Sequence, residues 1–157
     1  MITLEELRVR PIKDGTVIDH IKAGKALKVL RILGIDESHE NVVSIVMNVP
    51  SKKMKKKDII KLENVFLDKD TLNKIALISP KATINIIKNY KVVDKYVVEP
   101  PNTIVGIVKC QNPKCITNSE REHVTPKFTL VSKNPIAIRC HYCSRVMVGE
   151  EIEKNIV

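Results

Sequence analysis

The chain has 157 residues, a formal net charge of +9 and a sequence pI near 9.4. This length allows one compact domain or two small ones, with a core of Ile, Val and Leu because only 3% of the residues are aromatic. No apolar run could span a membrane, and the first residues lack the pattern of a signal peptide, so we expect a cytoplasmic protein. The basic charge favours anionic partners: nucleic acid, nucleotides or an acidic protein surface.

The first hundred residues predict strands and helices in a recognisable order. β-branched residues predict strands at 16–21, 41–49, 58–63, 82–87 and 91–98. Apolar residues at helical spacing predict one helix over 23–33, ended by Gly34, and a second between Asp68, a candidate N-cap, and Pro80. This order predicts an α+β fold class: a split βαβ, or ferredoxin-like, antiparallel sheet with both helices on one face, plus one additional strand.

The sequence Glu99-Pro100-Pro101-Asn102 is the clearest linker in the chain. It predicts two domains, comprising residues 1–99 and 103–157. The second domain is small, and a domain of that size buries little core and usually needs a covalent or metal staple.

All four cysteines lie in this second domain as two close pairs, Cys110 with Cys115 and Cys140 with Cys143. Two cysteine knuckles separated by a long loop are typical of four thiolates bound tetrahedrally to one zinc ion, with Zn–S distances of about 2.3 Å. Because cysteine fills all four positions, we expect a structural zinc with no open position for a catalytic water. Two disulfides in a secreted domain are the alternative, and His141 inside the second knuckle could replace one thiolate.

The sequence contains no motif of a stand-alone enzyme: no nucleophile elbow, no Gly-rich phosphate loop and no HExxH. The neighbouring Asp19 and His20 could form a general-base pair, but no serine or cysteine is evidently placed beside them. We therefore expect a protein that is not an enzyme.

The basic run at 52–57 is most simply a solvated hairpin loop between two strands. The functional alternative is an anion site, because Lys57, Ile59 and Lys61 point the same way from an extended segment. Two ammonium groups on one face of a sheet can hold a polyphosphate. Lys95 could add a third, and Asp19 could accept hydrogen bonds from a ribose.

Several segments resemble the regulatory chain of aspartate carbamoyltransferase, in order and over nearly the whole chain. They are GTVIDHI at 15–21, NVPS at 48–51, KDIIKLEN at 57–64, PKATIN at 80–85 and NYKVV at 89–93, followed by the two cysteine pairs. The resemblance implies a non-catalytic regulatory subunit in pyrimidine biosynthesis. Its ferredoxin-like domain would bind CTP, ATP and, in some members, UTP, and its small rubredoxin-like zinc-bound β domain would contact the catalytic chain. Regulatory homodimers would bridge catalytic trimers.

The resemblance also implies which residues bind the nucleotide. Asp19 matches a ribose contact, and Lys61 and Lys95 match lysines that reach ribose and phosphates. Residues that match positions around the base and ribose are Val9, Ile12, Ile87, Tyr90 and Val92, and those nearer the phosphates are His20, Ser51, Lys57 and Asn85. Arg10 and Pro11 replace an acidic residue and an alanine of enteric members, and Lys53 replaces an acidic residue. These departures bear on base recognition and leave open which nucleotide inhibits or activates.

A basic zinc-ribbon protein that binds nucleic acid is the alternative function, since a zinc ribbon with a high pI fits that class. Against it, aromatic residues for base stacking are scarce, and the zinc knuckles hold only Tyr142.

Overall fold

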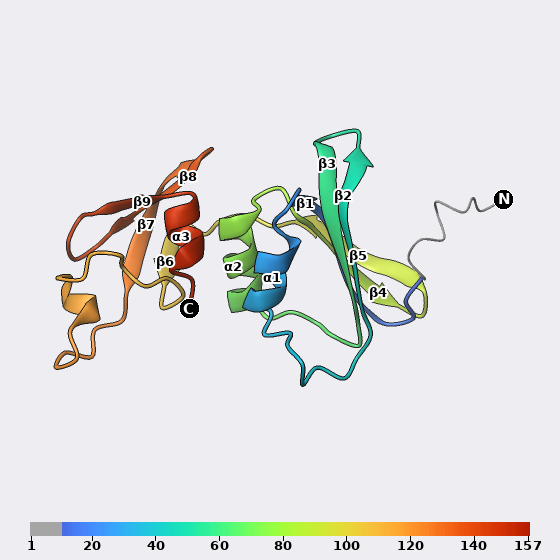
Figure 1. Ribbon diagram of the computed structural model, residues 1–157, viewed down its shortest axis with the longest axis horizontal. Helices are drawn as coiled ribbons and strands as arrows, with labels where there is room; N and C mark the ends of the chain where they lie inside the picture. The colour runs from blue at the N-terminus through green and yellow to red at the C-terminus, as the bar shows by residue number, and fades with distance from the viewer. Residues whose placement is uncertain (1–10) are drawn as a thin grey trace.

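The computed structural model describes residues 11–157 and has two antiparallel sheets with three helices between them (Figure 1). The larger sheet has the strand order β2-β3-β1-β4-β5. This sheet and two helices make up the amino-terminal half of the molecule. In chain order the elements are β1 (Gly15–Lys22), α1 (Ala26–Ile32), β2 (Val43–Ser51), β3 (Lys55–Glu63), α2 (Lys69–Ile78), β4 (Thr83–Lys88) and β5 (Lys91–Val97). Both helices cover the same face of this sheet (Figure 1). The predicted split βαβ arrangement with one additional strand is therefore confirmed.

Two of the predicted boundaries are wrong. β3 begins at Lys55, so only residues 52–54 of the basic run form the turn, and Lys57 lies within the strand. α1 begins at Ala26 and not at residue 23, because residues 22–25 form a turn. This turn is closed by a hydrogen bond from the Lys25 N–H to the Lys22 carbonyl. The second helix starts as predicted, since the Asp68 carboxylate accepts the Thr71 N–H at 2.8 Å.

A buried carboxylate joins the sheet to the first helix. Asp58 in β3 is fully buried, and its two oxygens accept backbone N–H groups from Gly24, Ala26 and Asn48 at 2.9–3.0 Å. Three donors satisfy a charge that burial would otherwise make costly. Asp58 thereby fixes the entry to α1 and the end of β2 relative to β3.

The core of this half is aliphatic, as the composition predicts. Alternate residues of the strands point towards the helices, among them Ile18 of β1, Ile60 of β3 and Ile84 of β4, and these pack against Val29 and Ile75. All five side chains are fully buried. The opposite face of the sheet therefore carries no helix and is left for the polar residues of the same strands.

The carboxyl-terminal half is a four-stranded sheet of order β6-β7-β8-β9. Its elements are β6 (Thr103–Val105), the 3-10 helix η1 (Ile116–Asn118), β7 (Lys127–Lys133), β8 (Ile136–Cys140), β9 (Val146–Val148) and α3 (Glu150–Lys154). Its core includes Phe128, Ile138 and Met147, and three of the four cysteines belong to the same buried cluster. No helix in residues 11–157 is long and apolar enough to cross a membrane.

The two halves meet where α3 lies against α2, with α1 packed beside α2 (Figure 1). Leu77 of α2 is buried in the core of the carboxyl-terminal half, and Ile156 packs against both cores. The buried Glu153 of α3 accepts hydrogen bonds from Lys25 at 3.0 Å and from Lys28 at 2.6 Å. Two positive charges and one negative charge therefore hold α3 at the start of α1.

The pKa of Glu153 reflects this pairing. Burial alone raises the pKa, but the hydrogen bonds from Lys28 and Lys25 more than reverse this, so the pKa lies below its ordinary value of 4.5. A lowered folded-state pKa means that the ion pairs stabilise the folded protein fully above the unfolded-state pKa. This stability is lost as the pH falls through the folded-state pKa.

We expect Glu153→Gln to lower the free energy of unfolding at pH 7 by about 1–3 kcal/mol, because charge-assisted hydrogen bonds between the halves are lost. Urea denaturation of the wild type and the variant measures this difference, which should shrink towards zero near about pH 3. Glu122→Gln, which changes an exposed carboxylate, is the matched control and should have little effect. An equal difference at both pH values would contradict the role given to the Glu153 charge.

Candidate functional site

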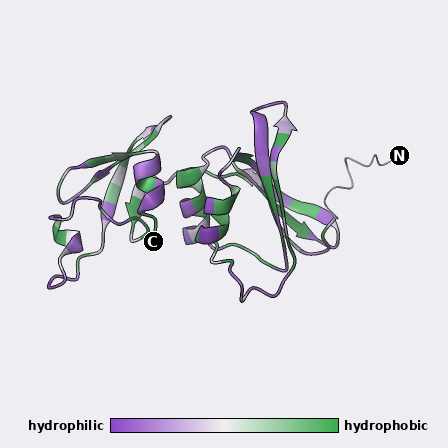
Figure 2. Ribbon diagram, viewed as in Figure 1, coloured by the Kyte–Doolittle hydropathy of each residue, from purple (hydrophilic) through white to green (hydrophobic). Residues whose placement is uncertain are grey.

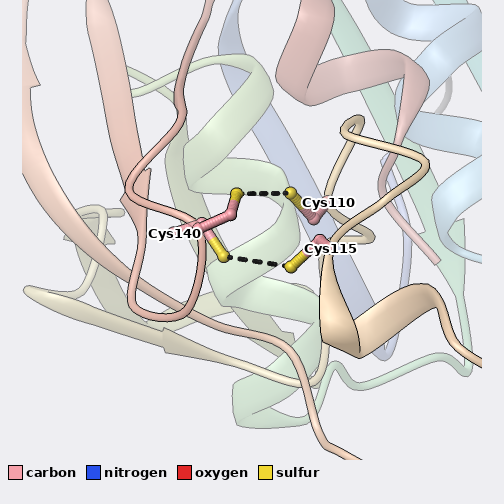
Figure 3. Close-up of side chains that lie close together, drawn as sticks. Cys110, Cys115 and Cys140 are labelled. Carbon is pink, nitrogen blue, oxygen red and sulfur yellow. Dashed lines mark hydrogen bonds between the residues drawn. The ribbon is translucent and has the colours of Figure 1, made fainter.

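The four cysteines form one cluster, as predicted. Their sulfur atoms all lie within 4.8 Å of one another. The Sγ atoms of Cys110 and Cys143 are 3.6 Å apart, and those of Cys115 and Cys140 are 3.7 Å apart (Figure 3). A tetrahedron with Zn–S distances of about 2.3 Å has edges of about 3.8 Å, so these separations fit a four-thiolate zinc site. They are far longer than the S–S bond of about 2.05 Å that the disulfide alternative would require.

The loops that carry the cysteines are fixed by their own hydrogen bonds. The Asn118 side-chain amide donates to the Cys110 and Asn112 carbonyls at 2.8 and 2.7 Å, which closes the first knuckle. Thr117 Oγ1 donates to Cys115 Sγ at 3.2 Å, and the Tyr142 N–H donates to Cys140 Sγ at 3.4 Å. Donors aimed at sulfur favour the thiolate form, which is the form that binds metal.

The electrostatics of the cluster favour a bound cation. Burial raises the pKa of Cys110 to about 12, and the neighbouring thiols add to this effect. For Cys143, burial also raises the pKa, but hydrogen bonds from the Arg145 backbone and from neighbouring side chains outweigh it and lower the pKa to about 7. Four thiolates can therefore coexist here only with a cation that replaces their protons.

His141 is not part of the cluster. Its ring nitrogen Nε2 pairs with Thr129 Oγ1, and its side chain is exposed. The four thiolates hold one structural zinc ion, and the possibility that His141 replaces one of them is set aside.

A second set of predicted residues meets on the helix-free face of the large sheet. Val17 of β1 pairs with Lys61 of β3 on one side and with Asn85 of β4 on the other. Asn85 in turn pairs with Lys95 of β5. Directly paired residues share a face, so Lys61, Asn85 and Lys95 lie in one row across the sheet. The Asn85 side chain donates to the Val17 carbonyl at 3.4 Å, which orients it along this row.

This face changes character along β1. At one end, Gly15 pairs with Ile87, which pairs with Val92, and the Tyr90 N–H donates to the Lys13 carbonyl beside them. Ile87 is buried, whereas Tyr90 and Val92 are exposed. The chain therefore offers an apolar patch here, next to the turn between β4 and β5.

The other end of this face is charged. It lies at Asp19, four residues of extended chain or about 13 Å from Gly15. Asp19 Oδ1 accepts from Lys57 Nζ at 2.9 Å. Ser51 ends β2, and its Oγ accepts the Met54 N–H in the neighbouring turn. Figure 2 shows that the start of β3 is hydrophilic where it joins this turn.

His20 and Lys61 are both partly desolvated. His20 lies at a bulge in β1 with φ of 54°, and its Nδ1 is 3.0 Å from Thr83 Oγ1. Burial lowers its pKa, the charge of Asp19 opposes this, and the nearby charges of Lys57, Lys53 and Lys95 lower the pKa further. Burial also lowers the pKa of Lys61, which Asp19 partly offsets. An anion bound here would favour the charged form of both groups.

The remaining predicted residues lie near the apolar end or outside the described part of the chain. Ile12 is buried and lies next to the apolar end of the sheet, because the neighbouring Lys13 carbonyl accepts a hydrogen bond from the Tyr90 N–H. Val9 and Arg10 lie outside residues 11–157. Pro11 and Lys53 are both exposed.

Sequence reasoning missed several residues that lie beside the predicted site residues. Val17 could have been found from strand alternation, because it lies two residues before Asp19 on the same face. Thr83, which contacts His20, becomes a neighbour only through the register of β1 and β4. Asn118 is not part of the cysteine motif, and no pattern in the sequence predicts that its side chain closes the first knuckle.

The fold and the metal cluster together define a class of proteins: an α+β domain with an open sheet face, joined to a small four-cysteine metal domain. Residues 7–99 match the family model "Aspartate carbamoyltransferase regulatory chain, allosteric domain". Residues 102–153 match "Aspartate carbamoyltransferase regulatory chain, metal binding domain". The chain therefore belongs to the family of aspartate carbamoyltransferase regulatory chains.

Relatives with the same name cover the chain almost completely. The aspartate carbamoyltransferase regulatory chain of Pyrococcus horikoshii is 57% identical over 154 residues, which is 98% of this chain and 100% of the relative. That of Korarchaeum cryptofilum is 55% identical over 152 residues, or 97% of each chain. The family is the non-catalytic subunit of an enzyme of pyrimidine biosynthesis, and its partner is the catalytic chain.

We expect zinc removal to unfold the carboxyl-terminal half and leave the larger sheet folded, because structural zinc contributes about 10–16 kcal/mol to domains of this kind. NMR spectra before and after chelation measure this: amides of residues 103–157 should lose dispersion, and those of β1–β5 should keep it. His141→Ala should retain one zinc per chain, whereas Cys140→Ser should not. A dispersed spectrum for residues 103–157 without metal would contradict the stapling role.

Proposed function

We propose that the helix-free face of the large sheet binds a nucleotide effector. The observation that carries this proposal is the row of Lys61, Asn85 and Lys95 between an apolar end and a basic end. A base fits the apolar patch of Ile87, Tyr90 and Val92, and phosphates fit the end with Lys57 and His20. CTP and ATP are the proposed effectors, with UTP as a third candidate, and Asp19 would accept hydrogen bonds from the ribose.

We propose the same twelve residues as at the sequence level for this site. They are Val9, Ile12, Asp19, His20, Ser51, Lys57, Lys61, Asn85, Ile87, Tyr90, Val92 and Lys95. Asp19 is already paired with Lys57. A triphosphate would compete for that lysine, and this frees the Asp19 carboxylate for a ribose hydroxyl.

We further propose a division of labour between residues 1–99 and 103–157. The first domain binds the effector, and the zinc domain contacts the catalytic chain. Exposed apolar side chains around the metal support this, since Ile116 follows the first knuckle and Tyr142 lies within the second. The zinc ribbon was the main reason to consider a nucleic-acid-binding protein. Membership of this family explains the zinc domain without nucleic acid, so that reason no longer applies.

A homodimer of this chain is also proposed. β2 and β5 are the outer strands of the large sheet, and each presents apolar side chains: Ile45 on β2, and Val93 and Val97 on β5. Outer strands of this kind pair readily with a second copy. A cytoplasmic location remains our prediction from the sequence.

We expect Lys61→Ala to weaken the binding of CTP and ATP by about 10- to 150-fold, the loss for a charge-assisted hydrogen bond of 1.5–3 kcal/mol. Calorimetric titration of CTP, ATP and UTP into the zinc-loaded chain measures it and ranks the three bases. Lys69→Ala removes an exposed lysine from the first turn of α2 and should bind like the wild type.

Assembly with the catalytic chain should survive Lys61→Ala, because the zinc domain is untouched. Two results would contradict the proposal that the sheet face is the nucleotide site. They are an unchanged nucleotide affinity in Lys61→Ala, and equal losses of affinity in Lys61→Ala and Lys69→Ala.

A further inference from the structure

A cleft of about 390 Å³ lies between the two halves of the molecule. One wall is the end of α2 and the segment after it, and the other is the turn between β7 and β8. Its floor is apolar, with Leu77 and Ile78 from α2 and Ile136 from β8, all buried. This volume falls within the range of small-molecule sites, about 300–1,000 Å³.

The rim of this cleft is strongly basic. Four lysines line it: Lys22 at the end of β1, Lys53 in the β2–β3 turn, Lys81 before β4 and Lys133 at the end of β7. Among residues 11–157, none of these four lysines has a carboxylate within 4.0 Å. The one acidic residue in the lining is Glu153, and its charge is already taken by Lys25 and Lys28.

The other polar groups add no negative charge. Ser79 is buried, and its Oγ accepts the Lys22 N–H at 3.0 Å. The remaining lining residues carry no charge: Met54, Pro80, Asn134, Pro135 and Gly149. Four exposed lysines around an apolar floor therefore remain without a carboxylate partner in the described part of the chain, an arrangement that is complementary to an anion with an apolar body.

We propose that this cleft binds a small organic anion with a dianionic headgroup of the phosphate-monoester type and an apolar body. The headgroup would lie among the lysine ammonium groups, and the body would lie on Leu77, Ile78 and Ile136. The cleft shares none of the twelve residues of the proposed nucleotide site, and Lys53 is the one lining residue whose charge also acts on His20 of that site. The cleft lies at the end of α2, and both helices cover the face of the sheet opposite to the proposed nucleotide face (Figure 1).

Binding here would act on the junction between the halves. Lys22, Lys53 and Lys81 belong to the amino-terminal half, and Lys133 belongs to the carboxyl-terminal half. A dianion between them replaces repulsion among these lysines by attraction to one shared charge. The ligand would therefore stabilise the packing of α3 on α2. The size of this stabilisation is the difference between the ligand's binding free energies for the packed and the separated halves.

Phenyl phosphate is the probe, because it joins a dianion to a compact apolar ring, and inorganic phosphate is the same headgroup without the ring. Two-dimensional NMR titration of the zinc-loaded full chain should shift the backbone amides of the non-proline residues in 77–81 and 133–136 together. Phenyl phosphate should bind at least about fivefold more tightly than inorganic phosphate, because only its ring buries apolar surface on the floor.

The lysines are tested by the double variant Lys81→Gln/Lys133→Gln, which should weaken phenyl phosphate binding by at least about tenfold. The matched control Lys69→Gln/Lys127→Gln removes the same charge from exposed lysines outside the cleft, one in each half, and should bind as the wild type does. Shifts confined to β1, β3 and β4, equal losses in both double variants, or no binding would each overturn the proposal. Thermal unfolding of both variants confirms that they are folded.

Discussion

Four thiolates around one zinc ion are the constraint on which the carboxyl-terminal half depends. Three of the four cysteines are part of its buried cluster, so the metal site and the apolar core are one unit. Without the metal, a buried thiol such as Cys110 resists ionisation, and its neighbours repel one another once charged. Zinc therefore fixes β6–β9, and that sheet in turn places α3 where it meets the other half.

A series of short polar contacts joins the proposed nucleotide face to the zinc domain. Lys57 pairs with Asp19 on the open face, and its neighbour Asp58 points to the other side of β3 and binds the start of α1. α1 then presents Lys28 to Glu153 on α3. A nucleotide that draws Lys57 away from Asp19 would act at the first of these contacts. Coupling of this kind is typically about 1–3 kcal/mol, which is comparable to what the Glu153 ion pairs can supply.

Much of this could be predicted from the sequence, for identifiable reasons. The cysteine spacing indicated the metal site because four thiolates at that spacing have few other uses, and the alternation of Lys57, Ile59 and Lys61 placed two lysines on one face. Local patterns failed where contacts are long-range. The later start of α1 depends on Asp58, which is 32 residues away from Ala26. The Glu153 ion pairs span 125 and 128 residues and are marked by no motif.

The most direct test of the central claim, that the junction between the halves carries the effector signal, uses the complex with the catalytic chain. Carbamoyltransferase activity is measured at subsaturating aspartate, with and without the nucleotide that binds most tightly, for wild type and Glu153→Gln. We predict that Glu153→Gln assembles and binds the nucleotide with wild-type affinity, yet its activity response falls at least about fivefold, as expected if about 1 kcal/mol of coupling is lost. A full nucleotide response in Glu153→Gln would contradict this claim.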